Sequence, residues 1–434
     1  MKKTILVVYF ARDVYPLRNA IKTHLFCFKN YSKNRIVYLN IAFGFPEKLL
    51  KGIHIDVIIF HTSFLGLRWN LDGFSDAIKK CQYLQNLNCL KVAMPQDEFY
   101  QTESLNDFFN QVKISHILTC AFKEDWNKIY DKINFENVKM MTVLTGYIDE
   151  KAIKRIKNLK KRCIKRNIDI GYRAWKTEYW LGEHGMKKVK IADAFSEIAK
   201  QNGLNTDISL EEKKVFLGDE WFKFLLSCKA ILGVEGGASV LDKDGHIKNS
   251  VDKYISVNPL ATFEETRANC FPCEDNYLGL ACISPRHFEA CITETCQFLI
   301  EGNYNGILIP WKHYVPVKSD YSNIQEVLDI LSQPKKMRNI VETAYKDIVD
   351  SNKWSYKAFI EELESEVINK VSTSNNSLKG LKHYYSLYKL YFRDIINWQF
   401  IKFSVLVLNS KAGKMIKKNT ILKKIIKNII LVRD

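Results

Sequence analysis

The chain has 434 residues and is 47% hydrophobic and 12% aromatic, which excludes a disordered polymer and suits two domains plus an appendage. No apolar run reaches the roughly 20 residues that a membrane-spanning helix needs. The formal charge of +17 would suit a nucleic-acid binder, but residues 371–434 hold 13 Lys and Arg against 2 Asp and Glu. The other 370 residues carry a net charge of only +6, so we expect no nucleic-acid partner.

The first residues imitate a signal peptide. Met1-Lys2-Lys3 precedes an apolar run of about seven residues that stops at Arg12 without a small-residue cleavage site, so we interpret the run as a buried strand. The 11 cysteines are odd in number and follow no framework spacing, which predicts reduced thiols in a cytoplasmic protein.

Six short apolar runs follow one another in residues 1–150. They are rich in Val and Ile and do not alternate with polar residues, as expected of strands buried on both faces of a parallel sheet. The polar gaps, such as Tyr15–Phe28 and Thr102–Val112, are long enough for crossover helices, so 1–150 is predicted to form a Rossmann-like α/β lobe. The predicted strands are Thr4–Phe10, Arg35–Ile41, Asp56–Phe60, Leu90–Met94, His116–Ala121 and Val138–Leu144.

The same pattern restarts after a basic linker at 151–167. A second Rossmann-like lobe is predicted over 168–335, and the two lobes should face a cleft at the carboxyl ends of their strands. Residues 336–370 are expected to close the second lobe with helices, and Gly236–Leu280 is expected to be irregular. The predicted strands are Ile168–Tyr172, Asn205–Leu210, Ala230–Val234, Gly306–Ile309 and His313–Val317, and the predicted helices are Gly185–Gln201, Glu220–Cys228, one from Pro285, and Ile324–Leu331.

Residues 371–434 differ from the rest of the chain. Between Ile416 and Ile430 the isoleucines recur near helical spacing, while lysines such as Lys417 and Lys424 occupy much of the other face. A basic amphipathic helix of this kind lies in an anionic membrane interface. We therefore expect a protein bound peripherally to the inner face of the cell membrane, with a helical hairpin that packs on the protein or a partner as the alternative.

The segment after Ile283 carries the clearest chemistry. Ser284 and Pro285 are good residues for the N-cap and first position of a helix, which places Arg286 and His287 in the first turn. Positive charge there opposes the helix dipole, and a bound anion would offset that cost. Glu289 lies on nearly the same face, where it could accept ribose hydroxyls or simply pair with Arg286.

This segment resembles the donor-binding region of glycosyltransferases with two Rossmann-like lobes, the GT-B fold, particularly CgeB-like and group 1 members. The likeness rests on Arg286-x-Phe288-Glu289, on Glu301-Gly302-x-Tyr304-x-Gly306, and on the run Pro310-Trp-Lys-His-Tyr314. It implies a nucleotide-sugar donor with its diphosphate on Arg286 and its ribose on Glu289, and catalysis without a metal. Retaining members carry a further glutamate eight positions earlier, where this chain has Ala281, so the stereochemical outcome stays open.

A glycine loop follows the predicted strand Ala230–Val234. Gly236 and Gly237 would let backbone N–H groups approach a sugar or phosphate, and Ser239 could bond the same group. Glu235 could contact sugar hydroxyls or lie near the reacting carbon. Arg173, at the end of the first strand of this lobe, is a further candidate for phosphate binding, as is Tyr304 for donor binding.

Three first-lobe residues at strand ends are candidates for a general base, if transfer inverts configuration: His61, Asp97 and Glu98. Arg12, in the first strand–helix loop, could touch the donor phosphate or the acceptor. Only Asp242 and Asp244 have the spacing of a metal-chelating pair, and we expect no metal requirement.

The sequence thus predicts a glycosyltransferase that acts on a glycan or lipid-linked acceptor of a cell-surface polysaccharide such as lipopolysaccharide or capsule. The alternatives are a sugar-nucleotide 2-epimerase and a non-catalytic, membrane-associated binding protein with the same fold.

Overall fold

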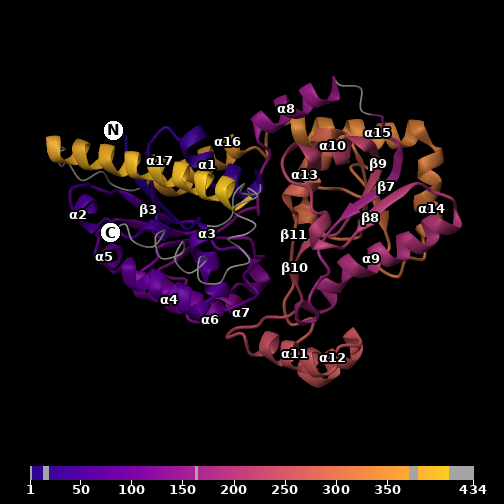
Figure 1. Cartoon of the computed structure of the whole chain (residues 1–434), viewed down its shortest axis with the longest axis horizontal. Coiled ribbons are helices and arrows are strands. Elements are labelled where there is room, and N and C mark those ends of the chain that lie inside the picture. Colours follow the sequence, from indigo (N-terminus) through magenta and orange to yellow (C-terminus); the bar gives the residue numbers. More distant parts are fainter. Residues whose placement is uncertain (1, 13–18, 162–164, 371–379, 410–434) are drawn as a thin grey trace.

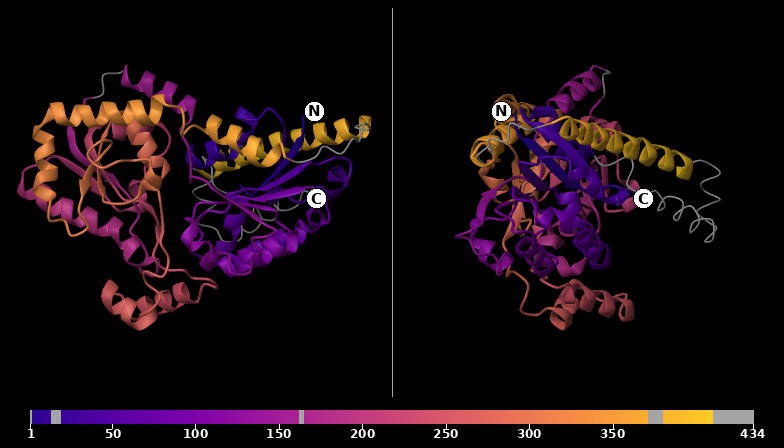
Figure 2. Two further views of the ribbon diagram at one scale, coloured as in Figure 1. Left: turned by 180° about the vertical axis from the view of Figure 1, so that it is seen from behind. Right: turned by 90° about the vertical axis from the view of Figure 1, so that its left-hand side faces the viewer.

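The computed structural model describes residues 2–12, 19–161, 165–370 and 380–409. Two α/β lobes lie side by side, and a long C-terminal helix runs along the first (Figures 1 and 2). The predicted pair of Rossmann-like lobes facing a cleft is therefore confirmed. Within the described ranges, no helix is both long enough and apolar enough to cross a membrane.

The first lobe is built on a six-stranded parallel sheet in the order β2-β1-β3-β4-β5-β6. All six predicted strands are present. The first five are largely buried between helices on both faces of the sheet, whereas the sixth lies at the sheet edge and is partly exposed. The strands are β1 (Thr4–Tyr9), β2 (Arg35–Asn40), β3 (Val57–Phe60), β4 (Leu90–Ala93), β5 (His116–Thr119) and β6 (Lys139–Thr142). The helices are α1 (Asn19–Tyr31), α2 (Glu47–Leu50), α3 (Thr62–Leu65), α4 (Leu71–Lys80), α5 (Gln82–Gln85), α6 (Thr102–Val112) and α7 (Trp126–Ile129).

The second lobe follows α8 (Glu150–Lys160) and holds a five-stranded parallel sheet in the order β13-β12-β9-β7-β8. In both sheets the first strand in the sequence lies between the second and the third, so the connectivity reverses beside β1 and beside β7. Ligands of open α/β sheets bind at such points. The strands are β7 (Ile168–Arg173), β8 (Thr206–Ser209), β9 (Cys228–Gly233), β12 (Cys296–Ile300) and β13 (Val315–Val317), and the helices include α9 (Gly182–Gln201), α10 (Asp219–Ser227), α13 (Pro285–Thr293), α14 (Ile324–Asp329) and α15 (Pro334–Ala344).

Two predictions for this lobe are wrong. The strand expected at Gly306–Ile309 is instead β12 at Cys296–Ile300, because Glu294 takes a left-handed φ of 52° and ends α13 just before that apolar run. The stretch Gly236–Leu280 is not irregular. It forms the antiparallel pair β10 (Gly236–Ala238) and β11 (Leu280–Cys282), with α11 (His246–Val257) and α12 (Phe263–Cys270) between them.

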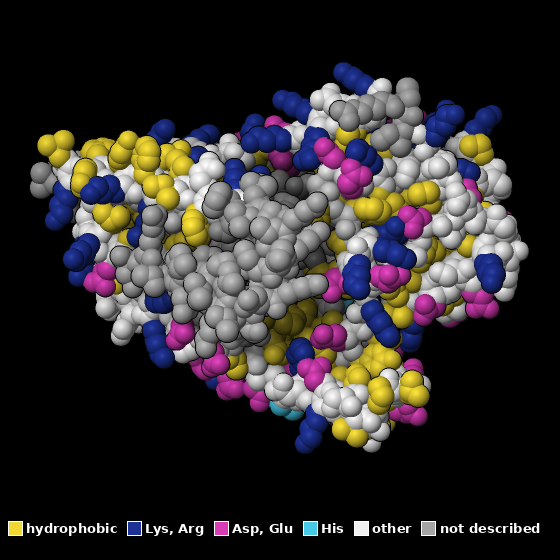
Figure 3. Space-filling model, viewed as in Figure 1, with side chains coloured by type: hydrophobic (Ala, Val, Ile, Leu, Met, Phe, Trp, Pro, Cys, Tyr) yellow, Lys and Arg dark blue, Asp and Glu magenta, His cyan; other side chains and the backbone are white. Residues whose placement is uncertain are grey.

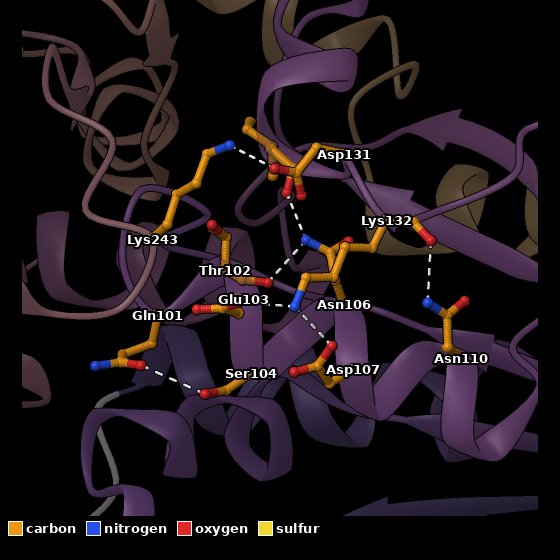
Figure 4. Close-up of polar contacts among 11 residues, drawn as sticks. Gln101, Thr102, Glu103, Ser104, Asn106, Asp107, Asn110, Asp131, Lys132 and Lys243 are labelled. Atoms are coloured by element: carbon orange, nitrogen blue, oxygen red, sulfur yellow. Dashed lines mark hydrogen bonds and ion pairs between the residues drawn. The ribbon is translucent and has the colours of Figure 1, made fainter.

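The segment between β10 and α11 ties the two lobes together. Asp242 donates its backbone N–H to the Phe99 carbonyl at 2.8 Å and accepts the Gln101 N–H at 2.8 Å. The Lys243 side chain reaches Asp131 of the first lobe beside the start of α6 (Figure 4). Main-chain hydrogen bonds therefore join the lobes on this side of the cleft.

The C-terminal helices divide between the lobes. The sequence assigned all of 336–370 to closing the second lobe, but only α15 and the helical turn at Tyr345–Asp350 pack there. Helix α16 (Tyr356–Leu363) and the turn at Glu364–Ile368 join the core of the first lobe and pack against α1. Helix α17 (Leu381–Asn409) then packs against β2 and α2. The predicted amphipathic helix at Ile416–Ile430 lies outside the described residues.

Candidate donor site between the lobes

A cavity of about 410 Å³ opens at the carboxyl ends of β7 and β9, where the second sheet reverses its connectivity. The loop after β7, the end of β9 and the start of α13 supply most of its wall, and Trp69 of the first lobe contributes to it. We term it the interlobe cavity. Its second-lobe lining includes Tyr172, Lys176, Lys188, Trp221, Gly236, Ser284, Arg286 and His287.

His287 presents a hydrogen-bond donor to this cavity. The Ser284 backbone N–H donates to His287 Nδ1 at 3.0 Å, so the ring proton is on Nε2. Burial lowers the His287 pKa to about 4, so the imidazole is neutral at pH 7. Nε2 faces Gly233, where an added Cβ would lie 3.4 Å from it. The α13 N-terminus thus offers a neutral N–H donor, and Tyr304 packs edge-on against the ring at 5.1 Å between centroids.

Arg286 and Lys188 bring two cations to the same wall. The Arg286 guanidinium lies 5.5 Å over the Trp221 ring and donates to the Arg173 carbonyl. Burial lowers the Lys188 pKa, and the neighbouring charge of Arg286 lowers it further. Two adjacent cations at a helix N-terminus repel each other unless an anion lies between them, so this wall suits a diphosphate.

Asp97 faces these cations from the first lobe. Its φ is 55°, a left-handed conformation that a non-glycine residue adopts at some cost. The residue is exposed to solvent, although protein atoms surround its carboxyl closely enough to desolvate it. Burial raises the Asp97 pKa, and the charges of Arg68 and Lys188 partly offset this rise.

The buried Arg68 holds the Asp97 loop in place. Its guanidinium donates to the carbonyls of Gln96 and Asp97 at 2.6 Å and to that of Tyr100 at 3.0 Å. Only 1% of the Arg68 side chain is exposed, so these bonds are made away from water. Because each lost bond would leave a buried donor unsatisfied, the loop is strongly constrained. The strained Asp97 backbone is therefore part of a rigid scaffold.

The other two candidates for a general base are buried in the first lobe, and none of the three candidates is among the described residues that line the interlobe cavity. Glu98 is fully buried and accepts hydrogen bonds from Thr119, Tyr130 and the Cys120 backbone, so it serves as a structural anchor. His61 is also fully buried, and its Nε2 lies 2.8 Å from His24 Nδ1. Burial lowers the pKa of both histidines, to about 4 for His24.

Several predicted donor ligands have structural partners instead. The Arg173 guanidinium pairs with Asp207 at 2.6 Å and stacks on Phe224 at 4.6 Å, so only its carbonyl serves the cavity, by orienting Arg286. Ser239 Oγ donates to Asp275 at 2.6 Å and accepts the His184 N–H, which caps the start of α9.

The two glycines of the predicted loop have different roles. Gly237 has φ 127°, and a Cβ there would lie 1.9 Å from the Leu280 carbonyl oxygen. The close pairing of β10 with β11 therefore requires glycine at 237, whether or not a phosphate binds. Gly236 lines the interlobe cavity.

The predicted glutamates lie beside the cavity. Glu235 accepts the Tyr304 N–H at 2.6 Å and the Asn303 N–H at 3.3 Å, so it holds the loop after β12. Glu289 accepts the Trp221 indole N–H at 2.8 Å, and burial raises its pKa to about 7. It lines a second cavity, beside Phe288 and Ile292 of α13, whereas Arg286 lines the interlobe cavity. The charge of Arg286 partly offsets the rise in the Glu289 pKa. Tyr304 is fully buried and donates to the Ile300 carbonyl rather than to the cavity.

Two further candidates lie elsewhere. Arg12 follows β1, outside the described lining of both cavities. Asp242, Asp244 and His246 bring ligand atoms within 4.8 Å of one another. Asp242, however, accepts three backbone N–H groups at the start of α11, from Gly245, Ile247 and Lys248 at 2.8 to 3.2 Å.

The sequence interpretation overlooked Lys188, Trp221, Trp69 and Arg68. Lys188 lies in the run Lys187-Lys188-Val-Lys190 of an amphipathic helix, where nothing local distinguishes it from solvated lysines. Trp69 is 42% exposed although it lines a cavity, and the apolar residues around it, such as Leu67 and Leu71, gave no sign of such a role.

Two parallel sheets facing a cleft, with a cationic helix N-terminus at the switch point of the second, define a two-lobed α/β protein with a candidate anion-binding site. No family model and no curated protein matches the chain. Among solved structures, it is similar to HepE of Anabaena in complex with UDP, with 8% identity over 85% of this chain and 99% of that one and a TM-score of 0.46. An α-glucosyltransferase in complex with UDP-glucose and DNA shows 12% identity, a TM-score of 0.47, and coverage of 85% and 100%. AviGT4, a glycosyltransferase of avilamycin A biosynthesis, shows 10% identity, a TM-score of 0.41, and coverage of 84% and 96%. At these identities and TM-scores the likeness supports no functional conclusion. The proposed function rests on the residues of the interlobe cavity.

Proposed function

We propose that the chain is a glycosyltransferase that moves a sugar from a nucleotide-sugar donor to an acceptor hydroxyl. The observation that supports this most directly is the convergence of Arg286, Lys188 and the His287 Nε2–H on one cavity wall, with Asp97 of the first lobe near enough to interact with Lys188. The second lobe would bind the donor diphosphate, and the first lobe would present the acceptor. A glycan or lipid-linked glycan of the cell surface is the acceptor that we propose.

In the proposed reaction, the Asp97 carboxylate takes the proton of an acceptor hydroxyl. The oxygen then forms a bond to the anomeric carbon, and the bond from that carbon to the diphosphate oxygen breaks. Negative charge accumulates on the departing nucleoside diphosphate, and Arg286, Lys188 and the α13 N-terminus stabilise it. A base on the lobe opposite the leaving group favours inversion. Because the cations neutralise the leaving group, we propose that no metal is required.

Ligand binding and product analysis test this proposal. A panel of nucleotide sugars should include one that raises the thermal stability, because a ligand at roughly 100 times its dissociation constant adds about 2.7 kcal/mol. With that donor, nucleoside diphosphate should appear only when an acceptor is present. Conversion of the donor to its 2-epimer without acceptor would contradict transfer and support an epimerase. The lack of affinity for every nucleotide sugar would support a non-catalytic binding protein.

A further inference from the structure

Helix α17 is apolar on two opposite sides. On its inner side, Leu387, Leu390 and Ile401 are buried against the first lobe. The Trp398 ring stacks on Tyr9 of β1, with 6.3 Å between centroids. An ordinary surface helix buries one apolar side in this way and exposes polar residues on the other side.

The outer side of α17 carries a second apolar stripe. Its residues recur at intervals of three and four, so they share one face of the helix. They are 37% to 92% exposed, and four of them are tyrosines. This outward stripe consists of Leu381, Tyr384, Tyr385, Tyr388, Tyr391, Phe392, Ile395 and Ile396.

Cations flank the outward stripe. Lys389 lies 4.5 Å over the Tyr385 ring, Lys29 of α1 lies 4.7 Å over Tyr391, and Arg35 of β2 lies 5.4 Å over Tyr384. The acidic side chain of α17, Asp394, points inward and accepts the Tyr9 hydroxyl at 2.6 Å. The space-filling view shows this band of hydrophobic side chains with Lys and Arg around it, along the upper rim of the first lobe (Figure 3).

We propose that the outward stripe binds the surface of an anionic phospholipid bilayer. A continuous apolar stripe of this length is unfavourable in water and marks an interaction surface. Tyrosine with flanking lysine and arginine suits the headgroup region, where aromatic rings are buried and cations meet lipid phosphates. A second copy of the chain would bring like charges together, so the bilayer is the better occupant.

The proposed contact lies flat on the membrane. With 29 residues, α17 is about 43 Å long, and its inner side stays packed on the first lobe while the outward stripe enters the interface. The contact is distinct from the basic segment Ile416–Ile430, and it is independent of glycosyl transfer.

Vesicle binding by the full chain tests this inference. Wild type should co-float with vesicles of phosphatidylcholine and phosphatidylglycerol, bind phosphatidylcholine alone much more weakly, and dissociate as salt is raised. The triple variant Tyr385→Ser, Tyr388→Ser, Ile396→Ser should lose binding by roughly tenfold or more, because it removes apolar groups from the interface. The matched control is Val257→Ser with Leu260→Ser, which changes exposed apolar residues near α11 (75% and 95% exposed) and should bind as wild type does.

Unchanged thermal unfolding of the triple variant would show that its fold is intact. Wild-type binding by that variant would overturn the inference and assign lipid binding to the segment beyond α17. Self-association of wild type that the triple variant abolishes, without vesicle binding, would also overturn it and identify a second copy as the occupant.

Discussion

Replacing Arg286 by alanine removes one of the two neighbouring cations, Arg286 and Lys188, from the proposed diphosphate wall. The guanidinium is held in place by Trp221 below it and by the Arg173 carbonyl, so its position is defined before any ligand binds. A preorganised charge that meets the leaving group is worth about 3–4 kcal/mol, which corresponds to a loss of roughly 100-fold or more in turnover. Lys188 remains in the variant and should still provide part of the positive charge that stabilises the leaving group.

The assay is acceptor-dependent release of nucleoside diphosphate, with the donor found in the binding screen. Arg286→Lys keeps the charge but loses the planar fork, so an intermediate loss is expected. Arg338→Ala on α15 removes an exposed arginine of the same lobe, away from the cavity, and should leave the rate unchanged. Full turnover by the Arg286→Ala enzyme would refute the assignment of this wall to the leaving group.

Three further predictions follow from the same geometry. Asp97→Asn should lower kcat by roughly 10²–10⁴-fold while calorimetry shows unchanged donor affinity. A general base acts when deprotonated and burial raises the Asp97 pKa, so the kcat of wild type should begin to fall with decreasing pH at a higher pH than for an ordinary carboxylate. A pH profile of kcat without this acidic limb would contradict the role of Asp97. Burial lowers the His24 pKa from 6.5 to about 4, so the stability that neutral His24 contributes is present above pH 6.5 and is lost as pH falls. The free energy of unfolding in urea should therefore be lower by roughly 2 kcal/mol near pH 5. A free energy of unfolding that does not change over that pH range would argue against the neutral His24–His61 pair. Gly237→Ala should cost about 2–4 kcal/mol of unfolding free energy because its Cβ meets the Leu280 carbonyl, whereas Gly236→Ala should cost under about 1 kcal/mol; equal effects would contradict the β10–β11 geometry.

Local pattern was sufficient to predict most of the fold. Strands such as β1 and β9 are apolar runs buried on both sides, and that pattern is visible in the sequence. The start of α13 was equally readable, because Ser284 and Pro285 are local signals for a helix N-terminus. β12 was misplaced because its apolar run follows α13 closely, and only the left-handed Glu294 and Thr295 separate them.

The candidate site was less predictable because long-range contacts decide it. The sequence predicts that Arg173 binds phosphate, but in the fold its guanidinium pairs with Asp207 of β8. His61 and Glu98 follow strands just as Asp97 does, but they point into the core, and residue type does not reveal that direction. Lys188 is significant only because α9 packs so that this lysine faces Asp97 across the cleft.

The most direct test of the central claim is calorimetric titration of nucleotide sugars into wild type and into Lys188→Ala. We expect one donor to bind wild type and to bind the variant roughly tenfold or more weakly, since one cation at the diphosphate wall is lost. Equal affinity of the two proteins for that donor would contradict a donor site in the interlobe cavity.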